Sequence, residues 1–119
     1  MEVGVGIHGE PGRRRAKLVS ATEDDELLGA VVPDLPYQSG DRVALMINGL
    51  GGTPISELYL LYGIAAQKLQ DQGITIARSY VGEYCTSLEM AGASLTLVKL
   101  DAEIEALLEA PASIVNRIF

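Results

Sequence analysis

The longest periodic stretch of the chain runs from residue 54 to residue 72. Apolar side chains recur there every three or four positions, and charged or amide side chains take the positions between them. Pro54 suits the first position of a helix, Thr53 can cap it, and Gly73 suits the position after its end. The pattern therefore predicts an amphipathic helix over 54–72.

Several short apolar runs predict β-strands. Residues 42–47 form a nearly continuous apolar run that Asn48 closes, residues 74–77 follow the long helix, and residues 94–100 are again largely apolar. Runs of this length between turn residues are typical of buried strands. Residues 2–7 have glycine at alternate positions, which predicts a further strand that another backbone approaches closely.

Two shorter helices complete the pattern. The first begins at Thr22, has Asp25 at the spacing of a capping box, and ends at Pro33. The second is a short amphipathic stretch over 101–108, before Pro111. Both are expected to bury one apolar stripe and to leave the other side in water.

The order of these elements predicts the fold class. Read from the amino terminus it is β-α-β-α-β-β-α, and alternating strands and helices are typical of an α/β domain. The last two strands are joined by an irregular connection over 81–93 without a long crossover, so at least one strand pair must be antiparallel. We expect a single domain over 1–119 with a mixed β-sheet and helices mainly on one face, in two layers.

Composition and charge narrow the classes of function. The 119 residues carry a formal net charge of −7, which repels nucleic-acid phosphates and anionic membranes, so neither is an expected partner. The one cysteine cannot form an intrachain disulfide, and no apolar run approaches the roughly 20 residues that span a bilayer. The first residues do not read as a signal peptide. We expect a cytoplasmic protein.

His8 is the strongest candidate for chemistry, because it is the only histidine in the chain. It lies where an apolar run meets Gly9-Glu10-Pro11-Gly12, whose glycines and proline disfavour both helix and sheet. An imidazole on such a shaped loop can project into a cleft. The residues alone leave two interpretations open: His8 could hold a small ligand, or it could only hydrogen-bond the adjacent backbone.

Other features carry weaker chemistry. The glycine loop at 49–53 opens a helix and could receive an anion, but it lacks a Walker lysine, so a tight turn is the favoured interpretation. The arginines at 13–15 could bind a phosphate, although a solvated basic turn is favoured. Cys85 has no second histidine to activate it. The acidic residues lack the spacing of metal ligands, so no metal is expected.

Four short motifs follow one another along the chain. They are GIHGEPG at 6–12, SGDRV at 39–43, NGLGGTP at 48–54 followed by ELY at 57–59, and TSLEMAG at 86–92. In this order they resemble the substrate-binding subunit of the dihydroxyacetone (glycerone) kinase family, from residue 2 to about residue 111. The resemblance implies the C-terminal half of that subunit and its fold, with the N-terminal half absent.

The resemblance also implies a reaction. In the family, the histidine of the first motif attacks the ketone carbon of dihydroxyacetone and holds it as a hemiaminal, and His8 occupies that position. The remaining substrate contacts, a general-base aspartate and a second histidine among them, belong to the N-terminal half. This chain should bind no cofactor itself. ATP or ADP with magnesium is expected on a partner nucleotide-binding subunit or domain, unless a phosphotransferase relay supplies the phosphoryl group, and the subunits are expected to form homodimers.

Alternatives to this kinase remain. Look-alikes of the substrate subunit can serve as non-catalytic sensors or co-activators, which need ligand binding without phosphoryl transfer. Proteins of the same broad fold also bind fatty acids, although they would not need the His8 motif. Related kinases accept other short ketoses and aldoses. The connection between Gly12 and Ser39 is also shorter here than in some members of the family.

Overall fold

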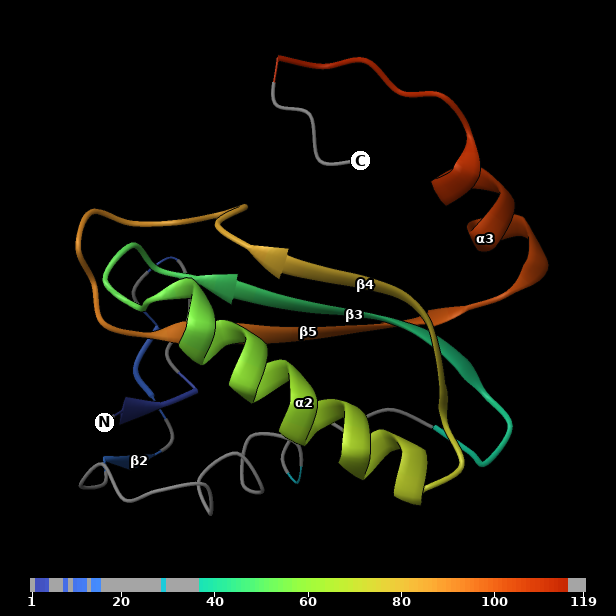
Figure 1. Ribbon diagram of the computed structural model, residues 1–119, viewed down its shortest axis with the longest axis horizontal. Coiled ribbons are helices and arrows are strands. Elements are labelled where there is room, and N and C mark those ends of the chain that lie inside the picture. Colours follow the sequence, from blue (N-terminus) through green and yellow to red (C-terminus); the bar gives the residue numbers. More distant parts are fainter. Residues whose placement is uncertain are drawn as a thin grey trace. The chain divides into compact units, whose positions relative to one another are not determined.

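The computed structural model describes residues 2–4, 8, 10–12, 14–15, 29 and 37–115 (Figure 1). The chain divides into two compact units, 1–36 and 37–119, and each is described by itself. The assignment of a single domain stays a prediction. None of the helices in the described part has both the length and the apolar character needed to cross a membrane.

The first unit contains a two-stranded antiparallel ladder. Strand β1 (Glu2–Val3) pairs with β2 (Arg14–Arg15), so that the two strands frame the loop that carries His8. The strand predicted over 2–7 is described only at its beginning. Of the helix predicted from Thr22, only Gly29 is described, and it is helical. The rest of both predictions lies outside the described residues.

The second unit is built on a three-stranded mixed sheet. Strand β3 (Arg42–Gly49) lies at its centre, parallel to β4 (Thr75–Gly82) and antiparallel to β5 (Ala93–Leu100). This confirms the predicted mixed sheet. The antiparallel pair joins β3 to β5 rather than the two strands that are consecutive in the sequence.

Strand β4 is longer than its predicted range of 74–77, because it continues to pair with β3 as far as Gly82. The register shifts where Val43 pairs with Ile76 but Ala44 pairs with Arg78. Such a bulge moves the following side chains to the other face, which breaks the alternation that marks a strand in sequence. Because Arg78 and Ser79 follow the bulge, the sequence pattern predicts that the strand ends before them, although both belong to β4.

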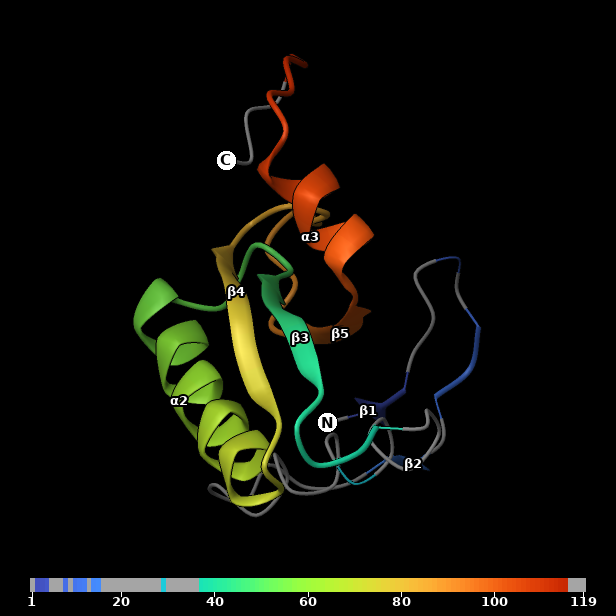
Figure 2. The same ribbon diagram turned by 90° about the vertical axis from the view of Figure 1, so that its right-hand side faces the viewer.

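The long helix α2 (Ile55–Asp71) covers one face of the sheet, as Figure 2 shows, and confirms the predicted helix to within one residue at each end. Its side chains Leu58, Ala65 and Leu69 are buried. Opposite them, the alternate β3 residues Val43, Leu45 and Ile47 have no exposed surface. This aliphatic layer between helix and sheet is the core of the second unit.

Gly73 ends α2, as predicted. It has φ +75°, and its N–H donates to the Gln70 carbonyl at 2.9 Å, while the Ile74 N–H donates to the Leu69 carbonyl at 2.9 Å. These two bonds make a Schellman motif, which turns the chain sharply from α2 into β4. Ile74 and Leu69 are both buried, as the apolar contact of this motif requires.

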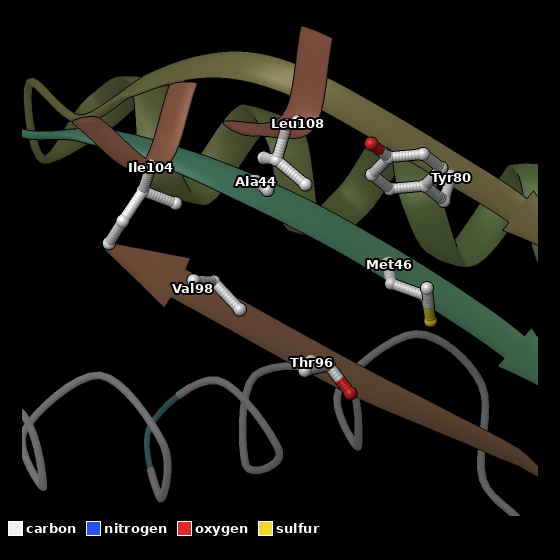
Figure 3. Close-up of a pocket in the computed structure, with 7 residues that line it drawn as sticks. All are labelled: Ala44, Met46, Tyr80, Thr96, Val98, Ile104 and Leu108. Atoms are coloured by element: carbon white, nitrogen blue, oxygen red, sulfur yellow. The ribbon is translucent and has the colours of Figure 1, made fainter. Parts of the chain in front are cut away.

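The short helix α3 (Ala102–Glu109) touches the opposite face of the sheet (Figure 3). Asp101 caps it by accepting a hydrogen bond from the Ile104 N–H at 2.8 Å. Ion pairs join Arg42 to Glu105 at 2.8 Å and Arg78 to Glu109 at 3.1 Å. An apolar cavity of about 200 Å³ lies between α3 and the sheet. It is lined by Ala44, Met46, Tyr80, Thr96, Val98, Ile104 and Leu108.

Replacing Gly73 tests the turn at the end of α2. Gly73→Ala should lower the free energy of unfolding by about 1–2 kcal/mol, because an alanine at positive φ is strained and its Cβ would collide with the Ser39 side chain. Gly63→Ala is the matched control inside α2, where a Cβ meets nothing within 4 Å, and it should stabilise by about 0.5–1 kcal/mol. Urea unfolding measures both, and equal effects would contradict this role of Gly73.

Acidification tests the exposed ion pairs around the start of β3. The Arg42 guanidinium lowers the pKa of Glu105 below its ordinary 4.5, and a backbone hydrogen bond from Gln38 together with Lys99 lowers the pKa of Asp41 below its ordinary 3.8. Because both folded-state values are depressed, their contribution to stability is complete above these ordinary values and is lost as the pH falls through the lowered ones.

We expect the wild-type chain to lose stability below about pH 4.5, and the Asp41→Asn/Glu105→Gln double variant to show a flatter decline, in urea unfolding at stepwise pH. Glu103→Gln is the control, since Glu103 lies on α3 but takes no part in the ion pairs of Arg42 with Glu105 and of Lys99 with Asp41. A double variant with the same pH profile as Glu103→Gln would rule out this linkage.

Candidate functional site

His8 lies in a turn within the loop between β1 and β2. Its backbone N–H donates to Glu10 Oε2 at 3.1 Å, and its ring Nδ1 lies 3.6 Å from Oε1 of the same carboxylate. The His8 side chain is 86% exposed. The loop is held further by Glu2, whose Oε1 accepts a hydrogen bond from the Gly12 N–H at 3.1 Å. The imidazole is therefore open to solutes, with one nitrogen beside a carboxylate.

Asn48 is a buried polar side chain at the end of β3, with 4% of its surface exposed. Its Oδ1 accepts hydrogen bonds from the N–H groups of Tyr84 and Cys85 at 2.8 and 2.9 Å. Its Nδ2 donates to the Cys85 carbonyl at 2.7 Å and to Ser94 Oγ at 3.3 Å. The amide is thus fully bonded, and it fixes the segment after β4 against the end of β3.

The glycine loop and the segment 83–92 form one interlocked structure. The Leu50 N–H donates to the Gly92 carbonyl, and the Met90 N–H returns a bond to Leu50. The Gly52 N–H donates to the Met90 carbonyl at 2.9 Å. Gly51 has φ +97°, and a Cβ there would collide with the Ser87 carbonyl. Two motifs that are distant in the sequence, NGLGGTP and TSLEMAG, therefore meet backbone to backbone.

Thr53 does not cap α2, and this prediction was wrong. Its hydroxyl donates to the Gly92 carbonyl at 2.8 Å and accepts from the Gly92 N–H at 3.0 Å. Pro54 takes the cap position without any side-chain hydrogen bond. The segment from β4 to β5 competes successfully for the hydroxyl, a long-range contact that local spacing cannot reveal.

The glycine loop also already holds a carboxylate. Glu83 Oε2 accepts hydrogen bonds from the Gly51 N–H at 3.2 Å and from the Thr86 hydroxyl at 2.7 Å. A phosphate would have to displace this negative charge as well as the backbone bonds of Leu50 and Gly52. The bond from the Gly51 N–H to Glu83 favours the interpretation of 49–53 as a tight turn over that of an anion site.

The weaker candidates from the sequence are Cys85, the arginines at 13–15 and the acidic residues. Cys85 is an exposed free thiol, and its backbone N–H and carbonyl form hydrogen bonds with the Asn48 side chain. Burial, followed by the nearby Tyr59 and Tyr80, raises the pKa of the Tyr84 phenol. The side chains at 13–15 lie outside the described residues. Among the residues that the structure does describe, no three His, Cys, Asp or Glu side chains gather closely enough to hold a metal ion.

Sequence reasoning did not single out three residues that the structure shows to be important. Asn48 could have been found as a polar residue closing an apolar strand, since a buried amide needs several partners. Glu10 could have been found as a carboxylate two residues after the only histidine. Glu83 carries no comparable sequence pattern, because its contact with Gly51 depends on the pairing of β3 with β4.

Comparison with known proteins gives consistent matches. Residues 1–116 match the Dak1 domain. The chain is 41% identical over 112 residues to the dihydroxyacetone-binding subunit of a PTS-dependent dihydroxyacetone kinase 2 from Listeria innocua, covering 93% of this chain and 34% of that protein. It is 47% identical over 116 residues to L-erythrulose 1-kinase from Mycolicibacterium smegmatis, covering 93% and 20%. The Escherichia coli PEP-dependent dihydroxyacetone kinase subunit is 40% identical, with coverage of 93% and 38%.

Solved structures show the same fold. One, described as concerning regulation of the dha operon of Lactococcus lactis, superposes with a TM-score of 0.81 at 33% identity and covers 91% of this chain and 35% of its own. The dihydroxyacetone kinase operon co-activator Dha-DhaQ gives a TM-score of 0.80 at 31% identity, covering 91% and 34%. The chain therefore spans between 20% and 38% of the length of these relatives and solved structures.

Replacing Asn48 tests the interlocked loops. Asn48→Ala should lower the free energy of unfolding by about 3 kcal/mol, because it leaves the N–H groups of Tyr84 and Cys85 without their acceptor. Ser94→Ala is the matched control: it removes only the 3.3 Å contact and should cost less than about 1 kcal/mol. Thermal and urea unfolding measure both, and similar losses in the two variants would refute the central role of Asn48.

Proposed function

Because the chain belongs to the Dak1 domain family, we propose that it forms part of a glycerone kinase and captures dihydroxyacetone for phosphorylation to dihydroxyacetone phosphate. The observation that carries the proposal is the open imidazole of His8 in its carboxylate-bearing loop. The names of the relatives support the substrate class, since dihydroxyacetone and erythrulose are both short hydroxyketones. Because the chain spans only 34% and 20% of these two relatives, the activity is proposed for the complete protein.

In the proposed step, a ring nitrogen of His8 adds to the ketone carbon. The nitrogen–carbon bond forms as the π bond of the carbonyl breaks, and the electron pair moves to the oxygen. The ring loses a proton through solvent and the oxygen gains one, so a hemiaminal results without a leaving group or a redox change. Such a nucleophile can be effective wherever its lone pair is free and accessible.

The covalent bond would provide both selectivity and orientation. Glycerol has nearly the same size as dihydroxyacetone and the same two terminal hydroxyl groups, but a third hydroxyl replaces the carbonyl to which the imidazole would add. A tethered triose also presents its terminal hydroxyl in a defined position. Phosphoryl transfer depends chiefly on such positioning and on electrostatic stabilisation, so a fixed acceptor supplies much of what the reaction needs.

The phosphoryl donor is proposed to lie on a partner subunit or domain that carries ATP and magnesium, or on a phosphotransferase relay. The engaged N–H groups of the glycine loop support this division, because Glu83 and Gly92 already use them. We further propose that the complete protein acts in the cytoplasm as a homodimer. Exposed apolar side chains such as Leu107 and Val115 are compatible with association.

A second function, that of a non-catalytic ketone sensor or co-activator, is favoured by one observation. A co-activator of a dihydroxyacetone kinase operon has the same fold at 31% identity. A sensor of this kind needs the capture of the ketone but not phosphoryl transfer. The two functions therefore share the chemistry of His8 and differ in the steps that follow it.

Carbon-13 NMR with dihydroxyacetone labelled at its carbonyl carbon tests the capture step. The samples are this chain and a chimera in which it replaces the corresponding part of the Escherichia coli subunit. We expect the chimera to convert the ketone resonance into that of a tetrahedral carbon, and His8→Ala to abolish the new resonance. Cys85→Ser is the control, because Cys85 is an exposed nucleophile that could also add to a ketone.

The absence of a His8-dependent resonance from both samples would reject the proposed capture. A phosphoryl-transfer assay with the nucleotide-binding partner of the Escherichia coli kinase then separates the two functions. Formation of dihydroxyacetone phosphate by the chimera supports the kinase, whereas a His8 adduct without transfer supports the co-activator.

A further inference from the structure

We infer that Glu10 is a positioning residue that fixes the orientation and tautomer of the His8 imidazole and leaves Nε2 as the nitrogen that adds to a ketone. The inference rests on the proposed function of His8 and adds the residue that prepares it. It starts from one carboxylate that faces the histidine at two points, the backbone N–H at 3.1 Å and ring Nδ1 at 3.6 Å.

These two contacts restrict the ring in complementary ways. The bond from the His8 N–H to Oε2 fixes the carboxylate relative to the backbone on which the ring is mounted. The other oxygen, Oε1, lies 3.6 Å from ring Nδ1, which is longer than a hydrogen bond. Contacts of this kind are often long in a site without substrate and shorten when the substrate binds.

The chemistry of the two groups decides which nitrogen stays free. An ionised carboxylate can only accept hydrogen bonds, whereas a neutral imidazole carries one N–H and one lone pair. A carboxylate beside Nδ1 therefore favours the proton on Nδ1 and the lone pair on Nε2. Nε2 belongs to a side chain that is 86% exposed, so a ketone can reach the ring.

The same carboxylate would also assist the addition. As the Nε2–carbon bond forms, the ring becomes an imidazolium before the Nδ1 proton leaves and the carbonyl oxygen is protonated. A negative charge close to Nδ1 stabilises that cation. Glu2, on β1, accepts a hydrogen bond from the Gly12 N–H, so it offers a control that changes a second carboxylate without removing the Glu10 contacts.

Nitrogen-15 NMR measures the tautomer directly, and with one histidine in the chain the ring signals need no assignment. We expect the wild-type chain to show mainly the Nδ1–H form, and Glu10→Ala to return to the Nε2–H form that free histidine prefers. Glu10→Gln keeps a side-chain oxygen for the backbone N–H but removes the charge. It should retain the loop and weaken formation of the ketone adduct in the chimera about tenfold. Glu2→Gln should change neither readout.

An unchanged tautomer in Glu10→Ala would overturn the inference, as would an equal loss of adduct in Glu2→Gln. The two readouts also separate the inference from the proposed function. A tautomer that follows Glu10 supports the positioning role even if no variant forms an adduct, and in that case only the proposed capture by His8 fails. If adduct formation depends on His8 but does not change in the Glu10 variants, the proposed capture by His8 is supported and the proposed role of Glu10 in it is rejected.

Discussion

The second unit depends on the need to satisfy one buried amide, that of Asn48. The strand order β4-β3-β5 places the partners of β3 on its two sides, so the chain from β4 to β5 must cross the end of β3. Asn48 lies at this crossing and binds both the crossing segment and the start of β5. Because an unpaired amide at 4% exposure is costly, any path of the crossing segment that left Asn48 without these partners would destabilise the unit.

The glycine-rich motif follows from that path. The segment 83–92 passes so close to the end of β3 that a Cβ at Gly51 or Gly52 would collide with its backbone, and one at Gly49 would collide with the Glu83 side chain. The glycines are thus a steric requirement of the crossing. This explains why a loop with the appearance of an anion site carries a carboxylate of the protein itself.

The parts of the fold that sequence predicts well are those decided by neighbours within one or two turns. The period of α2 and the stop at Gly73 depend on local geometry. The length of β4 and the role of Thr53 depend on segments that are distant in the sequence. For the candidate site, the sequence singled out His8, but the carboxylate that approaches it at two points became evident only from the conformation of the loop.

The residues that maintain the fold are largely distinct from the residues proposed to carry chemistry. Asn48, Thr53 and the glycine loop use their polar groups to bind the segment 83–92, so they have little capacity left to bind a ligand. His8 lies in the loop between the two strands of a short ladder, and a few carboxylate contacts shape this loop. Changes in such a loop can alter ligand chemistry without disturbing an aliphatic core. This separation gives a physical reason why proteins with the names of kinases for different ketoses and of a co-activator can share one fold.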